Sequence, residues 1–333
     1  MADRKYISDL KEGDVVSQVF HLASRNRLLT RSGKPYLSLT LGDKTGTVSA
    51  KVWDNADAIH AALGAAEFVR ISGTVEKYME EVQLKVDHVK VVRTEDVDLK
   101  DFLPASTRNP DEMLEELRQI AGTVGDRHLR SLLESVFADR SLVEGFKASP
   151  AAKHLHHRFV GGLLEHTLSV TKICDWLCGH YQNVKRDLLI AGAILHDIGK
   201  VYELRSSPSF DYTTEGRLVG HLILGWSLVE EKIRQIEGFP ADLRMHLEHL
   251  ILSHHGQYEF RAPVVPKTVE AMLLYQVDDL DAKVQLTQDW IEQAKGEPSE
   301  FTPFHKLLDR YFYKGPSALP RSAGVPPATP PPS

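Results

Sequence analysis

The sequence has few of the features that mark exported or membrane-spanning proteins. It contains only two cysteines, Cys174 and Cys178, which lie one helical turn apart in an apolar segment. This spacing excludes a disulfide framework and indicates a reducing compartment. No apolar run approaches the ~18 residues of a membrane helix, and no basic-then-apolar segment opens the chain. The net charge of −6 argues against electrostatic binding of nucleic acid over the whole surface, but leaves local basic patches open. We therefore expect a cytoplasmic protein with no membrane partner.

What the sequence does contain is ordinary for globular protein, except for its histidines. The 333 residues are 42% hydrophobic and 26% charged, which is enough for about two domains. Eleven of the 16 histidines fall between His154 and His255. The unusual chemistry is therefore concentrated in the second half of the chain.

The first hundred residues read as strands separated by turns. Five segments are rich in β-branched and apolar residues: 14–20, 35–41, 47–53, 67–75 and 82–86. Gly42 to Gly46 has hairpin-turn composition, and Asp54 to Ala66 reads as a short helix or loop. Five strands with a helical insertion between the third and fourth is the order of an OB-fold β-barrel. The segment from Asp43 to Trp53 resembles the second hairpin of OB-fold nucleic-acid-binding domains.

The same region carries cations and aromatic residues. No Asp or Glu occurs between Val15 and Gly42. Cations can follow phosphates while aromatic faces stack on bases, as binding of single strands requires. We predict that the nucleic acid is bound by Arg25, Arg27, Arg31, Lys34, Tyr36, Lys51, Trp53, Tyr78 and Lys85. The alternative is a solvated basic loop, with Tyr36 and Trp53 in the barrel core.

The alternation of apolar residues stops after Val92, and helical periodicity begins at Pro110. We predict a multidomain β + all-α protein, in which an N-terminal OB-fold β-barrel precedes an all-helical domain. The predicted units are an OB-fold domain (1–102), a helical linker (103–150), a helical domain (151–314) and a disordered Pro-rich tail (315–333).

One stretch of the helical half is apolar on nearly every side. It runs from Leu188 to Lys200 and contains His196 and Asp197, followed by Gly199 as a plausible helix terminator. A carboxylate at the end of a buried helix needs a partner or a metal. The alternative is a hydrogen-bonded pair that only stabilises the core.

The other histidines favour the metal. The order His, His-Asp, His, His-His, Asp resembles the HD-domain metal-dependent phosphohydrolase superfamily. The residues in this order are His166, His196, Asp197, His221, His254, His255 and Asp278. Imidazole and carboxylate ligands without thiolates suit Mn²⁺, Fe²⁺, Zn²⁺, Co²⁺ or Mg²⁺ rather than a closed structural zinc site.

The motif string can be matched more narrowly. The segments that carry the match are 156–167, 195–200, 212–221, 252–256 and 277–283. Together with the preceding barrel they resemble the YhaM-type 3′→5′ exoribonuclease family. The chain departs from that family in two places: Glu80-Glu81 stands where Gly is expected, and Asp279 stands where Asn is commoner. We expect Asp278 to bind the metal, with Asp279 as the alternative.

The resemblance implies an enzyme that hydrolyses single-stranded RNA from the 3′ end to nucleoside monophosphates, with single-stranded DNA as a further candidate substrate. It implies one or two divalent ions, with Mn²⁺ expected and Co²⁺, Mg²⁺ or Fe²⁺ as alternatives. His166, His196, Asp197 and Asp278 would bind the first ion, and Asp197 would bridge to a second one bound by His221, His254 and His255. His196, Asp197 and Lys200 are the expected catalytic residues.

In this interpretation Lys200 faces the scissile phosphate, and His157 is a weaker candidate for phosphate contact. Two other functions stay open. One is hydrolysis of small nucleotides with a regulatory OB-fold, and the other is a nucleic-acid-binding module with a structural HD site. A homo-oligomer is also left open.

Overall fold

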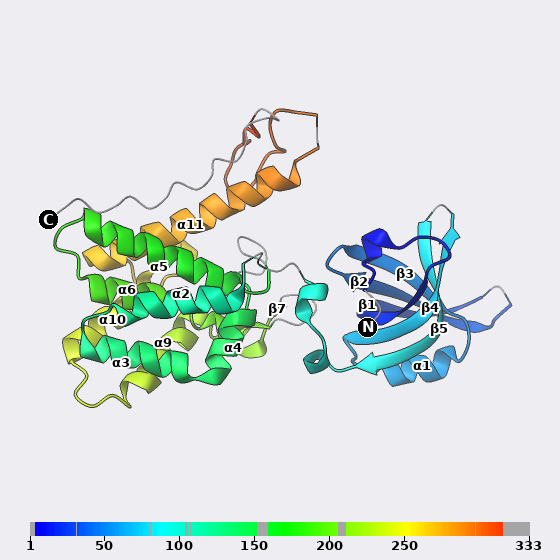
Figure 1. The fold of residues 1–333 in the computed structure, drawn as a ribbon, viewed down its shortest axis with the longest axis horizontal. Helices are drawn as coiled ribbons and strands as arrows, with labels where there is room; N and C mark the ends of the chain where they lie inside the picture. The colour runs from blue at the N-terminus through cyan, green and yellow to red at the C-terminus, as the bar shows by residue number, and fades with distance from the viewer. Residues whose placement is uncertain are drawn as a thin grey trace.

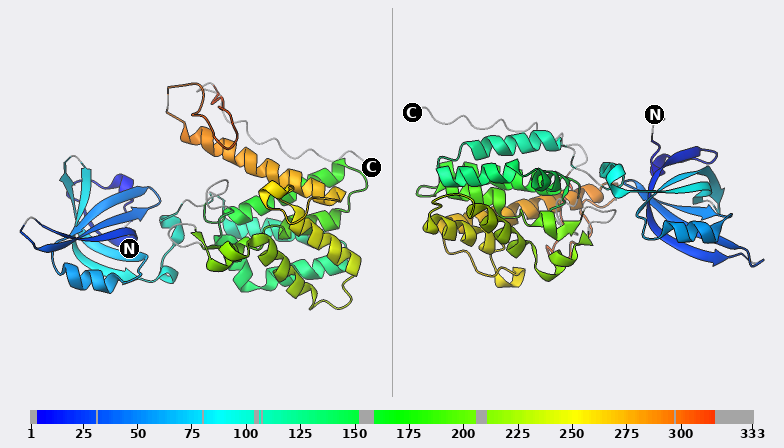
Figure 2. Two further views of the ribbon diagram at one scale, coloured as in Figure 1. Left: turned by 180° about the vertical axis from the view of Figure 1, so that it is seen from behind. Right: turned by 90° about the horizontal axis from the view of Figure 1, so that it is seen from below.

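The computed structural model describes residues 4–30, 32–79, 81–103, 106, 108–151, 159–205, 211–296 and 298–315. Figures 1 and 2 show these residues as a β-barrel and a helical unit, joined by a segment with two short 3-10 helices. Among the described residues, no helix combines the length and the apolar character that crossing a membrane would take. The predicted architecture, an OB-fold barrel followed by an all-helical HD domain, is confirmed.

Five strands close the barrel in the order β1-β2-β3-β5-β4, with β3 and β5 parallel and the other neighbours antiparallel. The strands are β1 (Val15–Leu29), β2 (Pro35–Asp43), β3 (Gly46–Val52), β4 (Phe68–Tyr78) and β5 (Glu81–Val92). Helix α1 (Ala56–Leu63) lies between β3 and β4 in sequence. Alternate residues of β2 and β3, among them Leu37, Leu39 and Ala50, point into a closed apolar core.

Strand β1 is longer than the predicted segment 14–20 and continues to Leu29. Its register with β2 shifts between Leu22 and Ser24, which leaves Ala23 as an extra residue. Because a bulge breaks the period-two alternation, the second half of the strand has no clear signature in the sequence.

The barrel is followed by η2 (Thr94–Asp96) and η3 (Leu99–Asp101), and by the helical unit. The first helices of that unit are α2 (Pro110–Gly122), α3 (Arg127–Ala138), α4 (Arg140–Ala148), α5 (Gly162–His180) and α6 (Arg186–Leu195). The later ones are α7 (Lys200–Glu203), α8 (Thr214–Leu218), α9 (His221–Ile233), α10 (Ala241–Ser253), η4 (Tyr258–Phe260) and α11 (Val269–Gln293). A two-stranded ribbon of β6 (Leu204–Arg205) and β7 (Asp211–Tyr212) separates α7 from α8.

The segment predicted as a helical linker takes part in the helical core. Leu117 of α2, Leu132 of α3 and Phe146 of α4 belong to the same buried cluster as Leu168 of α5 and Leu189 of α6. Amphipathic helices of this kind are stable because their apolar faces are covered. We therefore propose that the helical domain begins at Pro110 rather than at residue 151. The predicted disordered tail lies, apart from Gly315, outside the described residues.

Candidate metal centre and nucleic-acid face

The seven predicted ligands come from five separate elements and meet at one place. They are His166 on α5, His196 and Asp197 directly after α6, His221 at the first residue of α9, His254 and His255 directly after α10, and Asp278 on α11. Helix α6 is buried at every position from Leu188 to Leu195. Its burial carries the His196-Asp197 pair into the middle of the unit.

Asp197 lies at the centre of this group, with a side chain that is 1% exposed. Its Oδ2 atom lies 3.6 Å from Nε2 of His166 and 3.5 Å from Nε2 of His196. Its Oδ1 atom lies 3.5 Å from Nε2 of His221 and 3.5 Å from Nε2 of His254. The two oxygens of one carboxylate thus face two different sets of imidazoles.

The last predicted ligand, Asp278, lies beside the first set of imidazoles, which consists of His166 and His196. Nε2 of His166 lies 3.1 Å from Oδ1 of Asp278 and 3.3 Å from Nε2 of His196. The neighbouring carboxylate of Asp279 instead pairs with Lys283 at 2.6 Å. Of the two aspartates, Asp278 is therefore the one that lies in the cluster.

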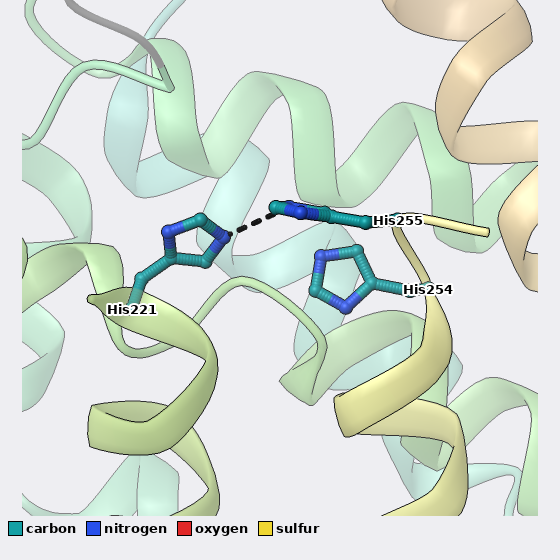
Figure 3. A group of neighbouring side chains, drawn as sticks. All are labelled: His221, His254 and His255. Atoms are coloured by element: carbon teal, nitrogen blue, oxygen red, sulfur yellow. Dashed lines mark hydrogen bonds between the residues drawn. The ribbon is translucent and has the colours of Figure 1, made fainter. Parts of the chain in front are cut away.

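The second set consists of three histidines, drawn in Figure 3. Nε2 of His221 lies 3.1 Å from Nε2 of His255, and the ring of His254 packs edge-on against that of His255. The ligand atoms of the three side chains lie within 4.8 Å of one another. This spacing allows all three to reach a common ion.

Backbone carbonyls orient three of the five rings. Nδ1 of His196 donates to the carbonyl of Ala193, and Nδ1 of His254 donates to that of Ile251, each at 2.8 Å. Nδ1 of His255 donates to the carbonyl of Phe260, also at 2.8 Å. Because a carbonyl only accepts, the proton of each neutral ring sits on Nδ1, and the lone pair on Nε2 points into the cluster.

Two carboxylates orient the remaining rings, and sequence reasoning missed both. Nδ1 of His166 lies 2.8 Å from Oδ2 of Asp281. Nδ1 of His221 lies 3.0 Å from Oε2 of Glu203, whose Oε1 accepts from the backbone N–H of His221 at 3.1 Å. Asp281 follows Asp278 by three residues on one helix face, a spacing that offered a signal. Glu203 offered none, because its contact with His221 is purely tertiary.

The donor set fits a divalent cation. Oδ1 of Asp197 and Nε2 of His254 are buried without a hydrogen-bond partner among the described residues. Such atoms are costly unless a cation or a proton satisfies them. The Nε2 lone pairs of His221 and His255 also face each other at 3.1 Å, an arrangement that an ion between them would stabilise.

Electrostatics favours the same conclusion. Burial would raise the pKa of Asp197, but the charge of Lys200, 2.6 Å from Oδ2, holds it well below its usual range. Burial, with the neighbouring His254 and His221, lowers the pKa of His255 to about 3, so its ring is neutral as metal binding requires. Burial opposes the charged form of His166, yet its carboxylate neighbours raise its pKa to about 9. That position therefore attracts positive charge.

Gly199 acts differently from the predicted helix terminator. Helix α6 ends at Leu195, and Gly199 has a φ of −64°, which is ordinary right-handed backbone. A Cβ at this position would lie 2.1 Å from the carbonyl oxygen of His221. Glycine is needed here because the His-Asp turn packs directly against the start of α9.

On the barrel, the structure brings four of the predicted nucleic-acid residues close together. The rings of Tyr36 and Trp53 stack with centroids 4.8 Å apart, and Trp53 is 38% exposed. Lys51 donates to Ser38 at 2.6 Å and is the register partner of Lys85 across the parallel β3–β5 pair. The alternative that placed Trp53 in the barrel core is wrong, because alternation puts Val52 inside and Trp53 outside.

Other predicted residues are less available. The guanidinium of Arg27 forms an ion pair with Asp57, and Lys34 pairs with Asp54 at 2.8 Å. Asp54 and Asp57 both follow β3 in the sequence. The fold therefore places their carboxylates beside the basic segment between Val15 and Gly42, which itself contains no Asp or Glu. Tyr78 is exposed at the tip of the β4–β5 hairpin, and Arg25 is half-buried. Arg31 and His157 lie outside the described residues.

Comparisons with known proteins agree with both halves of this description. Residues 163–283 match the family described as HD domain, and residues 22–92 match the OB-fold nucleic acid binding domain. The second OB-fold domain of replication protein A from Methanococcus maripaludis is a similar solved structure, with 17% identity, a TM-score of 0.22 and coverage of 28% of this chain and 98% of that chain.

The fold and the site thus define a divalent-metal-dependent phosphohydrolase with a nucleic-acid-binding barrel. The 3'-5' exoribonuclease YhaM of Shouchella clausii is 33% identical over 312 residues, which cover 93% of this chain and 96% of that protein. The protein of the same name from Bacillus subtilis is 34% identical over 306 residues, covering 91% and 95%. The chain belongs to the YhaM family.

Proposed function

We propose that this protein is a metal-dependent 3′→5′ exonuclease that hydrolyses single-stranded RNA to nucleoside monophosphates, with single-stranded DNA as a second substrate. The observation that carries the proposal is the position of Asp197 between two sets of imidazoles, each turned with Nε2 toward a shared space. The relatives' name as exoribonucleases and the OB-fold barrel support RNA as the substrate.

We assign His166, His196, Asp197 and Asp278 to a first ion. Asp197, together with His221, His254 and His255, would also hold a second ion. Divalent ions held by these residues, for which we expect Mn²⁺, would supply an activated water and neutralise charge on the phosphate and the leaving oxygen. The protein's own contribution is to present two carboxylates and five imidazoles, whose ring tautomers are already set by Nδ1 contacts.

Lys200 supplies a further positive charge at this place. Its ammonium is buried, and the carboxylate of Asp197 raises its pKa although burial would lower it. Lys200 therefore stays charged, and we assign it to the scissile phosphate. On the barrel, Tyr36 and Trp53 stack on bases while Lys51 and Lys85 follow the phosphates.

The decisive experiment uses a 5′-labelled single-stranded RNA, incubated with the protein and Mn²⁺, Mg²⁺ or EDTA. A ladder of products shortened by one nucleotide at a time, absent in EDTA, is the expected result. Asp278→Asn should abolish the ladder, whereas Asp279→Asn, with the same charge change one residue away, should retain it. Turnover of free nucleotides with the RNA left intact would contradict the proposal and assign the site to small substrates.

Location and assembly stay predictions of the sequence. We expect a cytoplasmic enzyme, and size-exclusion chromatography with light scattering will determine whether it forms a homo-oligomer.

A further inference from the structure

The barrel has a cavity that the proposed function does not use. Its volume is about 520 Å³, and it lies between Trp53 at the end of β3, one side of α1, and β5. Apolar side chains, including Ile59 of α1 and Val86 of β5, form part of its lining. A volume of a few hundred Å³ with an apolar lining and a few polar groups is typical of small-ligand sites.

The polar residues of this cavity carry a specific charge pattern. They include the carboxylates of Asp54 and Asp87 and the amide of Asn55. Lys85 and His88 also line the cavity. The carboxylate of Asp87 repels a phosphate, so the part of the cavity beside Asp87 is poorly suited to the RNA backbone. Carboxylates do accept hydrogen bonds from amino groups, which are the exocyclic donors of adenine, cytosine and guanine. Uracil has no exocyclic amino group, and its one ring N–H donor lies between two carbonyl oxygens, which a carboxylate repels.

Of the two carboxylates, Asp87 is the one available to a ligand. Asp54 is engaged by Lys34 at 2.8 Å. The exposed side chain of Asp87 makes no hydrogen bond or ion pair with another described residue.

The backbone holds Asp87 in a special position. In the β4–β5 ladder Ser72 pairs with His88 and Gly73 pairs with Val86, so Asp87 is the extra residue of a β-bulge. At Gly73 a Cβ would lie 2.2 Å from the carbonyl of Lys85, so glycine permits the strands to approach there. Bulges re-aim side chains at binding sites.

Trp53 links the cavity to the proposed path of the single-stranded RNA. The ring of Trp53 stacks on that of Tyr36, and Trp53 also lines the cavity. Lys85 lines the cavity as well and is the register partner of Lys51 on the neighbouring strand. Trp53 and Asp87 line the same cavity, so a base stacked against Trp53 would lie beside the cavity that Asp87 lines. We infer that the cavity beside Trp53 reads one nucleobase of the bound strand and favours a base with an exocyclic amino group over uracil. This inference rests on the proposed binding of single-stranded RNA.

The test measures binding of labelled rA12, rC12 and rU12 to the full chain by fluorescence anisotropy, in EDTA so that the probes are not cleaved. We expect rA12 and rC12 to bind at least about tenfold more tightly than rU12, the size of one hydrogen bond to a charged group. Asp87→Asn should remove most of this preference, because an amide both donates and accepts. Glu76→Gln, an exposed carboxylate of β4 outside the cavity, should leave it unchanged.

The outcomes separate the two proposals. Equal affinity for the three oligonucleotides, or a preference that survives Asp87→Asn, would overturn the base-reading pocket and leave the exonuclease proposal standing. No binding of any oligonucleotide would overturn both the barrel's proposed role and the pocket, while cleavage could still be assayed separately. Displacement of rA12 by free AMP at the same concentration of bases would assign the cavity to a free nucleotide and overturn its assignment to the strand.

Discussion

Gly199 touches the backbone of His221: a Cβ added to Gly199 would lie 2.1 Å from that carbonyl oxygen and 2.5 Å from the amide nitrogen of Gly225. Neither atom belongs to a flexible side chain. The turn that carries His196 and Asp197 is therefore seated directly on the first turn of α9, which begins with His221.

Gly199→Ala should push α9 away from Asp197 and displace His221. We expect a loss of about 1–3 kcal/mol in the free energy of unfolding, as for other overpacked positions, and at least a tenfold loss of RNA hydrolysis. The measurements are thermal unfolding and single-turnover cleavage. The matched control is Gly179→Ala in α5, where a Cβ meets nothing within 4 Å. Equal behaviour of both variants would contradict the close contact.

Asp281→Asn should weaken metal binding although Asp281 is not a proposed ligand. The variant keeps an oxygen that can accept from Nδ1 of His166, but it removes the charge that makes Nε2 a better donor. We expect about a 10- to 100-fold lower affinity for Mn²⁺, measured by isothermal titration calorimetry. Asp279→Asn, whose carboxylate pairs with Lys283, should bind Mn²⁺ as the parent does. Indistinguishable affinities for the two variants would show that Asp281 does not position His166.

His254→Ala should distinguish one bound ion from two. Nε2 of His254 is buried and faces Oδ1 of Asp197 at 3.5 Å, on the side of the proposed second ion. With two ions, elemental analysis at saturating Mn²⁺ should give about half the parent's metal content, and the rate should fall sharply. One ion per chain in both proteins would rule out the binuclear centre.

Lys85→Ala should reduce the salt dependence of RNA binding. A cation that contacts a phosphate releases counterions, and each such contact on a single strand contributes about 0.7 to the slope of log K against log salt. We expect a decrease of about 0.7 for Lys85→Ala and a smaller one for Arg27→Ala, because Asp57 already pairs with that guanidinium. The slopes follow from anisotropy titrations at several salt concentrations. A larger effect of Arg27→Ala would mean that RNA displaces Asp57.

The sequence alone was sufficient to predict features that depend on local pattern. Alternation of apolar residues indicated the strands of the barrel, because one face of each strand is buried. The order from His166 to Asp278 predicted the ligand set through its resemblance to the HD-domain superfamily, and the structure brings these seven side chains together. The burial of α6 followed from its uniform apolar character.

Only the tertiary structure decided which residues act on one another across the fold. Glu203 positions His221, and Asp57 neutralises Arg27, through contacts that no periodicity in the sequence reports. Asp278 and Asp279 carry the same side chain, but successive residues of a helix are rotated by about 100°. Asp278 therefore faces His166, whereas Asp279 faces Lys283. The sequence states which chemical group each side chain carries. The distances and directions between side chains on different helices and strands are set only when the apolar faces of those elements pack together.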